Sequence, residues 1–150
     1  MSAQSRASLA LMATTDLPPA QALNAVKQAI DRVRGGGASL LTTGIQNLGA
    51  RVHVEREHDG RLELSINSGK RIVELCTFLA TASALEGTTS LQVGGLNRYK
   101  TTQSTLLGFI PVGPKQIAAM SPYKRFLAEV ESALKASDPR VQVTIGESAA

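Results

Sequence analysis

The apolar positions in the first part of the chain change from a two-residue period to a period of three or four. Residues 8–14 alternate in the manner of a strand that is buried on one side. From Asp16 onwards the spacing is that of an amphipathic helix, with apolar positions at Leu23, Val26, Ile30 and Val33. Glycines 35–37 end this helix, because glycine adopts the left-handed C-cap conformation without strain. Residues 38–50 fit either a short strand or a short helix.

Residues 51–67 show the clearest local pattern, two alternating runs around a turn sequence, and they predict a β-hairpin. A two-residue turn would pair Val54 with Ser65 and mix the apolar and polar faces. A three-residue loop pairs Val54 with Leu64 and leaves one continuous apolar face, since a slip of one residue reverses every side chain. We therefore predict a three-residue loop with a bulge and with Gly60 in the left-handed conformation.

Residues 71–85 form a long apolar run whose period is ambiguous. Part of the run fits helical spacing, whereas its β-branched and aromatic residues favour a strand, and we predict a strand. Turn formers at 86–88 then lead into a returning strand over residues 89–104. Gly94-Gly95 indicates a bulge in that strand, because adjacent glycines interrupt a regular ladder.

The last part of the chain contains a run of turn formers and then a strongly amphipathic helix. Residues 107–116 hold two glycines and two prolines, and we predict a loop. Residues 121–136 carry an apolar stripe at helical spacing and predict a C-terminal helix. The sequence thus predicts one α+β domain over residues 1–140, an antiparallel β-sheet wrapped on the long C-terminal helix with one helix near the N-terminus. Residues 141–150 are expected to form a flexible tail.

Composition excludes several classes of protein. Apolar residues make up 43% of the 150 residues, which is enough to bury a core without crosslinks. The single cysteine, Cys76, rules out an internal disulfide framework. No apolar run in the sequence reaches the roughly 18 residues that a membrane-spanning helix needs. The apolar stretch 7–13 is short for a signal peptide and lacks a cleavage site, so we expect a cytoplasmic protein.

The charges are nearly balanced but unevenly placed. The chain has 16 basic and 12 acidic residues, a net charge of +4. No acidic residue lies between Glu86 and Glu129, a stretch that carries Arg98, Lys100, Lys115, Lys124 and Arg125. Segment 98–125 is either a solvated face that lacks acids or a surface that binds an anion or nucleic acid.

Side chains that could perform chemistry are few. His53 and His58 have no cysteine or carboxylate partners at metal-ligand spacing, so we predict surface histidines and no metal site. Cys76 lies in an apolar run, and we predict a buried, inert thiol. Glu74 is either functional or simply at an edge or paired position. We find no catalytic constellation and expect no cofactor, and whether the protein is an enzyme stays open.

The order of strand, helix, antiparallel strands and long C-terminal helix resembles that of the helix-grip proteins, the START-like (SRPBCC) superfamily that includes polyketide-cyclase-like proteins. The likeness spans most of the chain but rests on element order, length and the helix 121–136, so no catalytic residue can be carried over. The chain departs from the group in having one helix between its first strands where two are usual. It also has few aromatic residues, at 3%.

This resemblance implies an apolar or amphipathic ligand held between the sheet and the C-terminal helix. The pocket it implies would be bounded by Phe78, Tyr99, Phe109, Phe126 and Val130. Phe109 and Ile110 would act as a lid, since large apolar side chains in a loop should cover something. Lys115, at the end of that loop, would either be solvated or meet an acidic head group.

Functions of different classes follow from these observations. The first is a small cytoplasmic binding protein for an apolar or amphipathic small molecule or lipid. The second is an anion-binding or nucleic-acid-binding protein that uses segment 98–125. The third is an interaction protein, in which the apolar residues between Phe109 and Val112 form a patch for a partner. The oligomeric state is not indicated by the sequence.

Overall fold

The computed structural model of the chain describes residues 6–34, 50–67 and 73–147, without the side chains of residues 34, 104, 114 and 115. Its elements are β1 (Leu9–Thr15), α2 (Pro19–Arg34), β2 (Arg51–His58), β3 (Arg61–Asn67), β4 (Glu74–Leu85), β5 (Thr88–Tyr99), β6 (Thr101–Leu106), β7 (Ile110–Ile117), α3 (Met120–Ser137) and β8 (Gln142–Glu147). The glycines 35–37 and nearly all of the ambiguous segment 38–50 lie outside the described residues.

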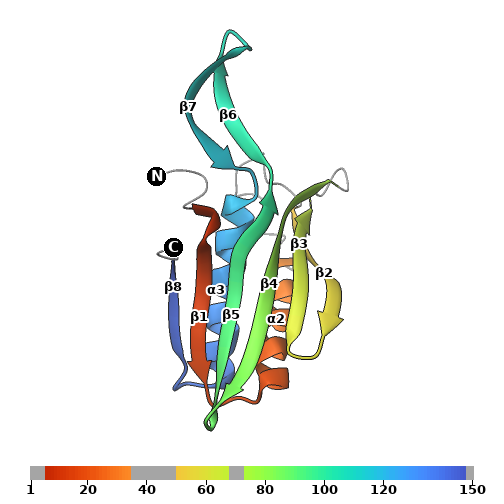
Figure 1. The fold of residues 1–150 in the computed structure, drawn as a ribbon, viewed down its shortest axis with the longest axis vertical. Coiled ribbons are helices and arrows are strands. Elements are labelled where there is room, and N and C mark those ends of the chain that lie inside the picture. Colours follow the sequence, from red (N-terminus) through yellow and green to blue (C-terminus); the bar gives the residue numbers. More distant parts are fainter. Residues whose placement is uncertain (1–5, 35–49, 68–72, 148–150) are drawn as a thin grey trace.

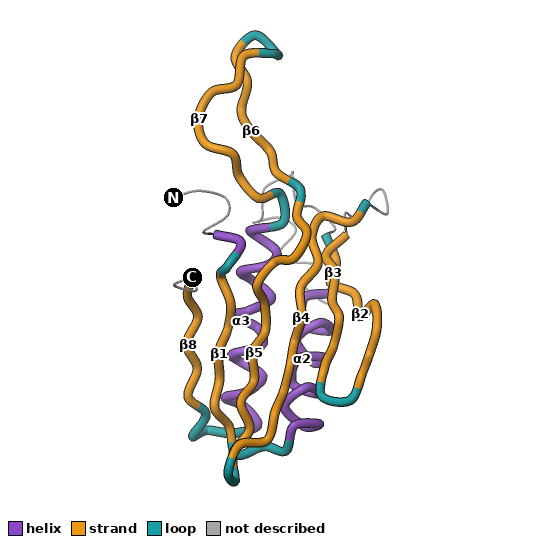
Figure 2. The backbone as a smooth tube through the Cα atoms, viewed as in Figure 1, coloured by secondary structure: helices purple, strands orange, loops and turns teal. Residues whose placement is uncertain are grey.

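A six-stranded antiparallel sheet and two helices form two layers, with α2 and α3 side by side on one face of the sheet (Figure 1). The strand order is β2-β3-β4-β5-β1-β8, so the first strand of the chain lies between β5 and β8. Strands β6 and β7 pair only with each other and extend beyond the end of the sheet (Figure 2). The predicted α+β class, with an antiparallel sheet packed on a C-terminal helix, is confirmed.

The polar and apolar alternation of the sequence explains how the two layers meet. In β1, Leu11 is fully buried against the helices while Met12 is 48% exposed on the open face of the sheet. Residues Leu23, Val26 and Ile30 of α2 are buried at the predicted helical spacing. The predicted strand over 71–85 is confirmed as β4, whose residues from Cys76 to Ala82 alternate between buried and half-buried.

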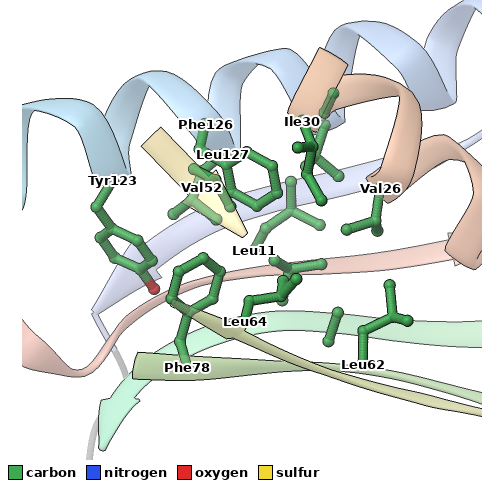
Figure 3. Close-up of a cluster of buried hydrophobic side chains, with 14 of the residues drawn as sticks. Leu11, Val26, Ile30, Val52, Leu62, Leu64, Phe78, Tyr123, Phe126 and Leu127 are labelled. Carbon is green, nitrogen blue, oxygen red and sulfur yellow. The ribbon is translucent and has the colours of Figure 1, made fainter. Parts of the chain in front are cut away.

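The core lies between the sheet and the two helices (Figure 3). From α3, Tyr123 and Phe126 project toward Phe78 of β4, and all three side chains are at most 1% exposed. The Phe78 ring centroid lies 5.1 Å from that of Tyr123, edge to face, and 5.7 Å from that of Phe126. Aromatic pairs at these separations stabilise a core beyond the area they bury.

The β2–β3 hairpin has the predicted apolar face but a different turn. Val54 pairs with Leu64, and Gly60 has a φ of +75°, both as predicted. The loop, however, is the two-residue turn Asp59-Gly60, because His58 pairs with Arg61. A bulge between Val54 and Arg56 shifts the register by one residue and restores the apolar face. The prediction of a three-residue loop is therefore wrong: the extra residue lies inside the strand.

Two segments that the sequence left irregular form strands. The predicted loop 107–116 is instead a short turn at residues 107–109 followed by most of β7. The predicted flexible tail 141–150 is wrong for residues 142–147, which form β8 on β1. In both segments main-chain pairing with a neighbouring strand overrides the local signals, since β propensity depends strongly on context.

Two polar contacts fasten α3 to β1. The buried Tyr123 hydroxyl donates a hydrogen bond to the Leu9 carbonyl and accepts one from the Gly95 N–H at 3.1 Å. At the other end of the helix, Thr15 Oγ1 donates to Asp138 Oδ2 at 2.7 Å. Each contact satisfies groups that would otherwise be buried without a partner, which is costly.

Candidate functional site

The most distinctive surface feature of the molecule is the two-stranded hairpin of β6 and β7, residues 101–117, which we call the arm (Figures 1 and 2). Its base is fixed to the body. Ile117 is buried in the core, and the Lys100 N–H donates to the Leu75 carbonyl of β4 at 2.9 Å. The Ala118 N–H closes the base by donating to the Lys100 carbonyl at 2.9 Å. The arm thus projects from a well-anchored origin.

The outer half of the arm is apolar and solvent-exposed. We call its five large apolar residues the tip: Leu106 (55% exposed), Leu107 (76%), Phe109 (75%), Ile110 (39%) and Val112 (40%). Leu106 pairs with Ile110, and Val112 lies two residues further along β7, so these three side chains share one face of the ribbon. The other face has Thr105 opposite Pro111.

The turn at the end of the arm holds a leucine in a strained conformation. Leu107 has a φ of +57° and Gly108 a φ of +81°, and the Phe109 N–H donates to the Leu106 carbonyl at 3.3 Å. Two positive φ values are the mark of a type I′ turn, in which asparagine or glycine is preferred at the first central position. A leucine there costs about 1–2 kcal/mol relative to glycine.

The middle of the arm is irregular in a way that disfavours pairing with further strands. The register shifts between Thr102 and Ser104, and Gln103 Nε2 donates to the Gly113 carbonyl at 2.7 Å across the shift. Pro111 and Pro114 on β7 have no N–H to offer to a neighbouring strand. The arm is therefore built to present side chains and not a backbone edge.

The structure describes the side chains of four of the five basic residues of segment 98–125, and these four do not lie together on one face. Arg98 pairs in register with Thr77 and so lies on the open face of the sheet, where its Nη2 is 3.2 Å from Glu74 Oε1. Lys124 and Arg125 lie on α3 in the helix layer. Lys100 is exposed at the base of the arm.

The seven residues predicted to line a pocket lie in separate places. Phe78, Phe126 and Val130 are buried in the core, in contact with other core side chains. Tyr99 is half-buried beside them, opposite Cys76 in the sheet. Phe109 and Ile110 lie on the tip. The side chain of Lys115 lies outside the described residues.

The groups considered for chemistry are buried or paired. Burial raises the pKa of the Cys76 thiol to about 12, so the thiol is protonated and inert at neutral pH, as predicted. His58 Nε2 lies 2.7 Å from Glu63 Oε2 on the surface, and that hydrogen bond lowers the pKa of Glu63. Glu74 is exposed and paired with Arg98, which matches the paired position considered for it, although β4 is an interior strand and not an edge of the sheet. Among the described residues no three His, Cys, Asp or Glu side chains are placed to hold a metal ion.

Leu106 and Leu107 belong to the tip, but the sequence analysis did not identify them as candidate site residues. The signal was a glycine preceded by an apolar pair and followed by another, Leu106-Leu107-Gly108-Phe109-Ile110. This pattern is compatible with a hairpin turn, but the usual asparagine or aspartate before the glycine is absent. The two prolines that follow favoured a loop instead.

A comparison with protein-family models, curated proteins and solved structures finds no significant match to this chain. None of the described helices is both long and apolar enough to span a membrane. The function is therefore inferred from the geometry of the molecule.

Proposed function

We propose that this protein is an interaction subunit that inserts the tip of its β6–β7 arm into an apolar recess of a protein partner. The observation that carries the proposal is the exposure of five large apolar side chains at the end of a projecting hairpin. Burying a side chain of this size stabilises a complex by roughly 1.5–3 kcal/mol before the costs of association. Contiguous exposed apolar surface of this kind is typical of protein–protein contact sites.

The strained turn supports the same function independently. The fold gains nothing from a leucine at position 107, because its side chain is 76% exposed and its φ is positive. Asparagine or glycine would relieve the strain. Backbone strain is commonly found at binding sites, where the contact made by the side chain offsets it. A partner that buries Leu107 and Phe109 accounts for both residues.

The surroundings of the tip indicate the chemistry of the partner. Lys100 is exposed at the base, so a recess with carboxylates at its mouth would complement the arm. Pro111 and Pro114 oppose strand addition along β7, and recognition would therefore depend on side-chain insertion. An isolated two-stranded ribbon is marginally stable in water, so the partner would also order the arm.

The apolar-ligand function, the anion-binding alternative and membership of the helix-grip superfamily stay predictions. The geometry supports these three predictions less than it supports a docking function for the arm. Phe78 and Phe126, two residues predicted to line the pocket, pack against each other and are 0–1% exposed. Phe109 lies away from them on the tip. Arg98 and Lys124, two of the residues predicted to bind an anion, lie in different layers of the molecule.

The proposal is tested by photo-crosslinking in the cells that make the protein. A benzophenone amino acid replaces Phe109 in one variant and Gln92, exposed on the open face of the sheet, in the control. We expect one discrete crosslinked protein from position 109, absent from position 92, and lost when Leu107→Asp is added. Equal crosslinking at both positions would contradict a docking tip. A thermal shift with fatty acids that Phe109→Ser abolishes would favour the ligand-binding function instead.

A further inference from the structure

Strand β8 forms one edge of the six-stranded sheet (Figure 1). It pairs with β1 along its whole length, from Gln142 opposite Thr14 to Glu147 opposite Leu9, without a shift in register. Within the described residues no strand lies on its outer side. The outer N–H and C=O groups of such a strand are a ready template for one more strand.

The two edges of the sheet differ in how they are protected. The other edge strand, β2, carries a bulge after Val54 and a run of charged residues, Arg51, Glu55, Arg56 and Glu57. Bulges and charges are the usual devices that prevent edge-to-edge pairing. Strand β8 has no bulge, no proline and no lysine, and its only charged residue is the terminal Glu147.

The outer side of β8 also exposes apolar surface. Ile145 and Val143 pair with Leu11 and Ala13, which face the helices, so all four side chains point to the same face. Ile145 is 38% exposed and Val143 is half-buried. A strand added beside β8 would cover both side chains on the side that the helix layer leaves open.

We propose that β8 pairs antiparallel with β8 of a second copy of this chain and joins the two sheets into one continuous sheet. Antiparallel pairing of identical strands is two-fold symmetric, and it places Ile145 and Val143 of both copies on the same face. Arg140 precedes the strand and Glu147 ends it, so the antiparallel arrangement brings opposite charges near each other at both ends of the pair. A parallel arrangement would align like charges, which argues for a two-fold pair.

The decisive measurement is sedimentation equilibrium of the whole protein. We expect a reversible monomer–dimer equilibrium, and Ile145→Lys should raise the dimer dissociation constant at least tenfold. The control is Val54→Lys, which introduces the same charge at a residue of nearly equal exposure, 40%, on the protected edge. It should leave the dissociation constant unchanged. Circular dichroism establishes that both variants fold.

A second measurement covers the case in which Ile145→Lys does not fold. A spin label is attached to a cysteine introduced at exposed Gln142 in a Cys76→Ala background. Double electron–electron resonance then measures the distance between the labels of the two copies. Antiparallel β8 pairs hold the two Gln142 backbones within about 20 Å, given the spacing of strands and residues in a sheet. A distance beyond about 40 Å would overturn the proposal.

Other outcomes also decide against it. A protein that stays monomeric up to about 1 mM has no such interface of measurable affinity. A dimer that Phe109→Ser dissociates and Ile145→Lys does not would show that association uses the arm. That result would leave the interaction function proposed for the arm intact, because the two surfaces lie on different strands.

Discussion

The hydroxyl of Tyr123 occupies the space that any side chain at position 94 would need. A Cβ built on Gly94 would lie 2.1 Å from this oxygen and 3.0 Å from the Ala10 Cα. The register shift in β5, which lies between Gly94 and Arg98, therefore begins where the Tyr123 hydroxyl packs, and β5, β1 and α3 meet at this point.

The first prediction follows from this fit. Gly94→Ala should lower the free energy of unfolding by about 3 kcal/mol or more, because it displaces the hydroxyl and strains a residue with a φ of +121°. Gly95→Ala is the matched control: its φ is +77°, but nothing lies within 4 Å of an added Cβ. Left-handed strain alone should cost about 1–2 kcal/mol. Equal losses in urea denaturation would show that the hydroxyl can move away freely.

The second prediction compares one substitution at two phenylalanines. Phe126→Ala should cost roughly 3–5 kcal/mol, since the side chain is fully buried against Phe78. Phe109→Ala should change stability by about 0.5 kcal/mol or less, because the side chain is 75% exposed. Both values come from chemical denaturation of the isolated protein. A large loss at Phe109 would mean that the tip packs on the body in solution, contrary to a docking role.

The third prediction concerns alkaline pH. Burial raises the pKa of Cys76 to about 12 from an ordinary value of 9.0. The folded thiol therefore keeps its proton at pH values where the unfolded chain loses it. Stability from this group is complete below pH 9 and falls as the pH rises towards 12, by up to about 1.4 kcal/mol per pH unit. Urea denaturation at pH 8, 9 and 10 should show this slope in the parent and a flatter profile in Cys76→Ala.

The fourth prediction concerns acidic pH. The hydrogen bond from Thr15, followed by that from the Asp16 N–H, lowers the pKa of Asp138. Stability from this carboxylate is present above its ordinary pKa of 3.8 and is lost as the pH falls through the lower folded value. Asp138→Asn should therefore be less stable than the parent at pH 7, with a difference that shrinks toward pH 2. Thermal melts of the parent and Asp138→Asn between pH 7 and pH 2 check this. A difference in melting temperature that is the same at every pH would show that the contact does not titrate.

The sequence predicted the parts of the fold in which local pattern and tertiary packing agree. The stripes of α2 and α3 and the alternation of β1, β3 and β4 each identify a buried face without further information. The apolar pairing of Val54 with Leu64 was predicted for the same reason. The bulge that produces this pairing was placed in the loop, because a one-residue insertion has the same effect on register at either position.

The arm and β8 were not predictable from local pattern. β8 is a strand because β1 offers it an edge, and that edge is made by residues more than a hundred positions earlier. Residues 107–116 of the arm were interpreted as a loop because their prolines and glycines usually interrupt a strand. The apolar residues of this segment were expected either to cover a cavity in this chain or to form a patch for a partner. The tip keeps them exposed, which is the reason it is a candidate site.

The position of β1 in the sheet also sets an order of events during synthesis. The strands β2 to β5 follow one another through hairpins and can pair as each leaves the ribosome, since their contacts are local. Strand β1 is made first, yet its neighbours are β5 and β8, and Leu9 finds its partner Glu147 only when the last strand appears. One edge of β1 can therefore pair once β5 has been translated, whereas its other edge stays unpaired until residues 142–147 of β8 have been made.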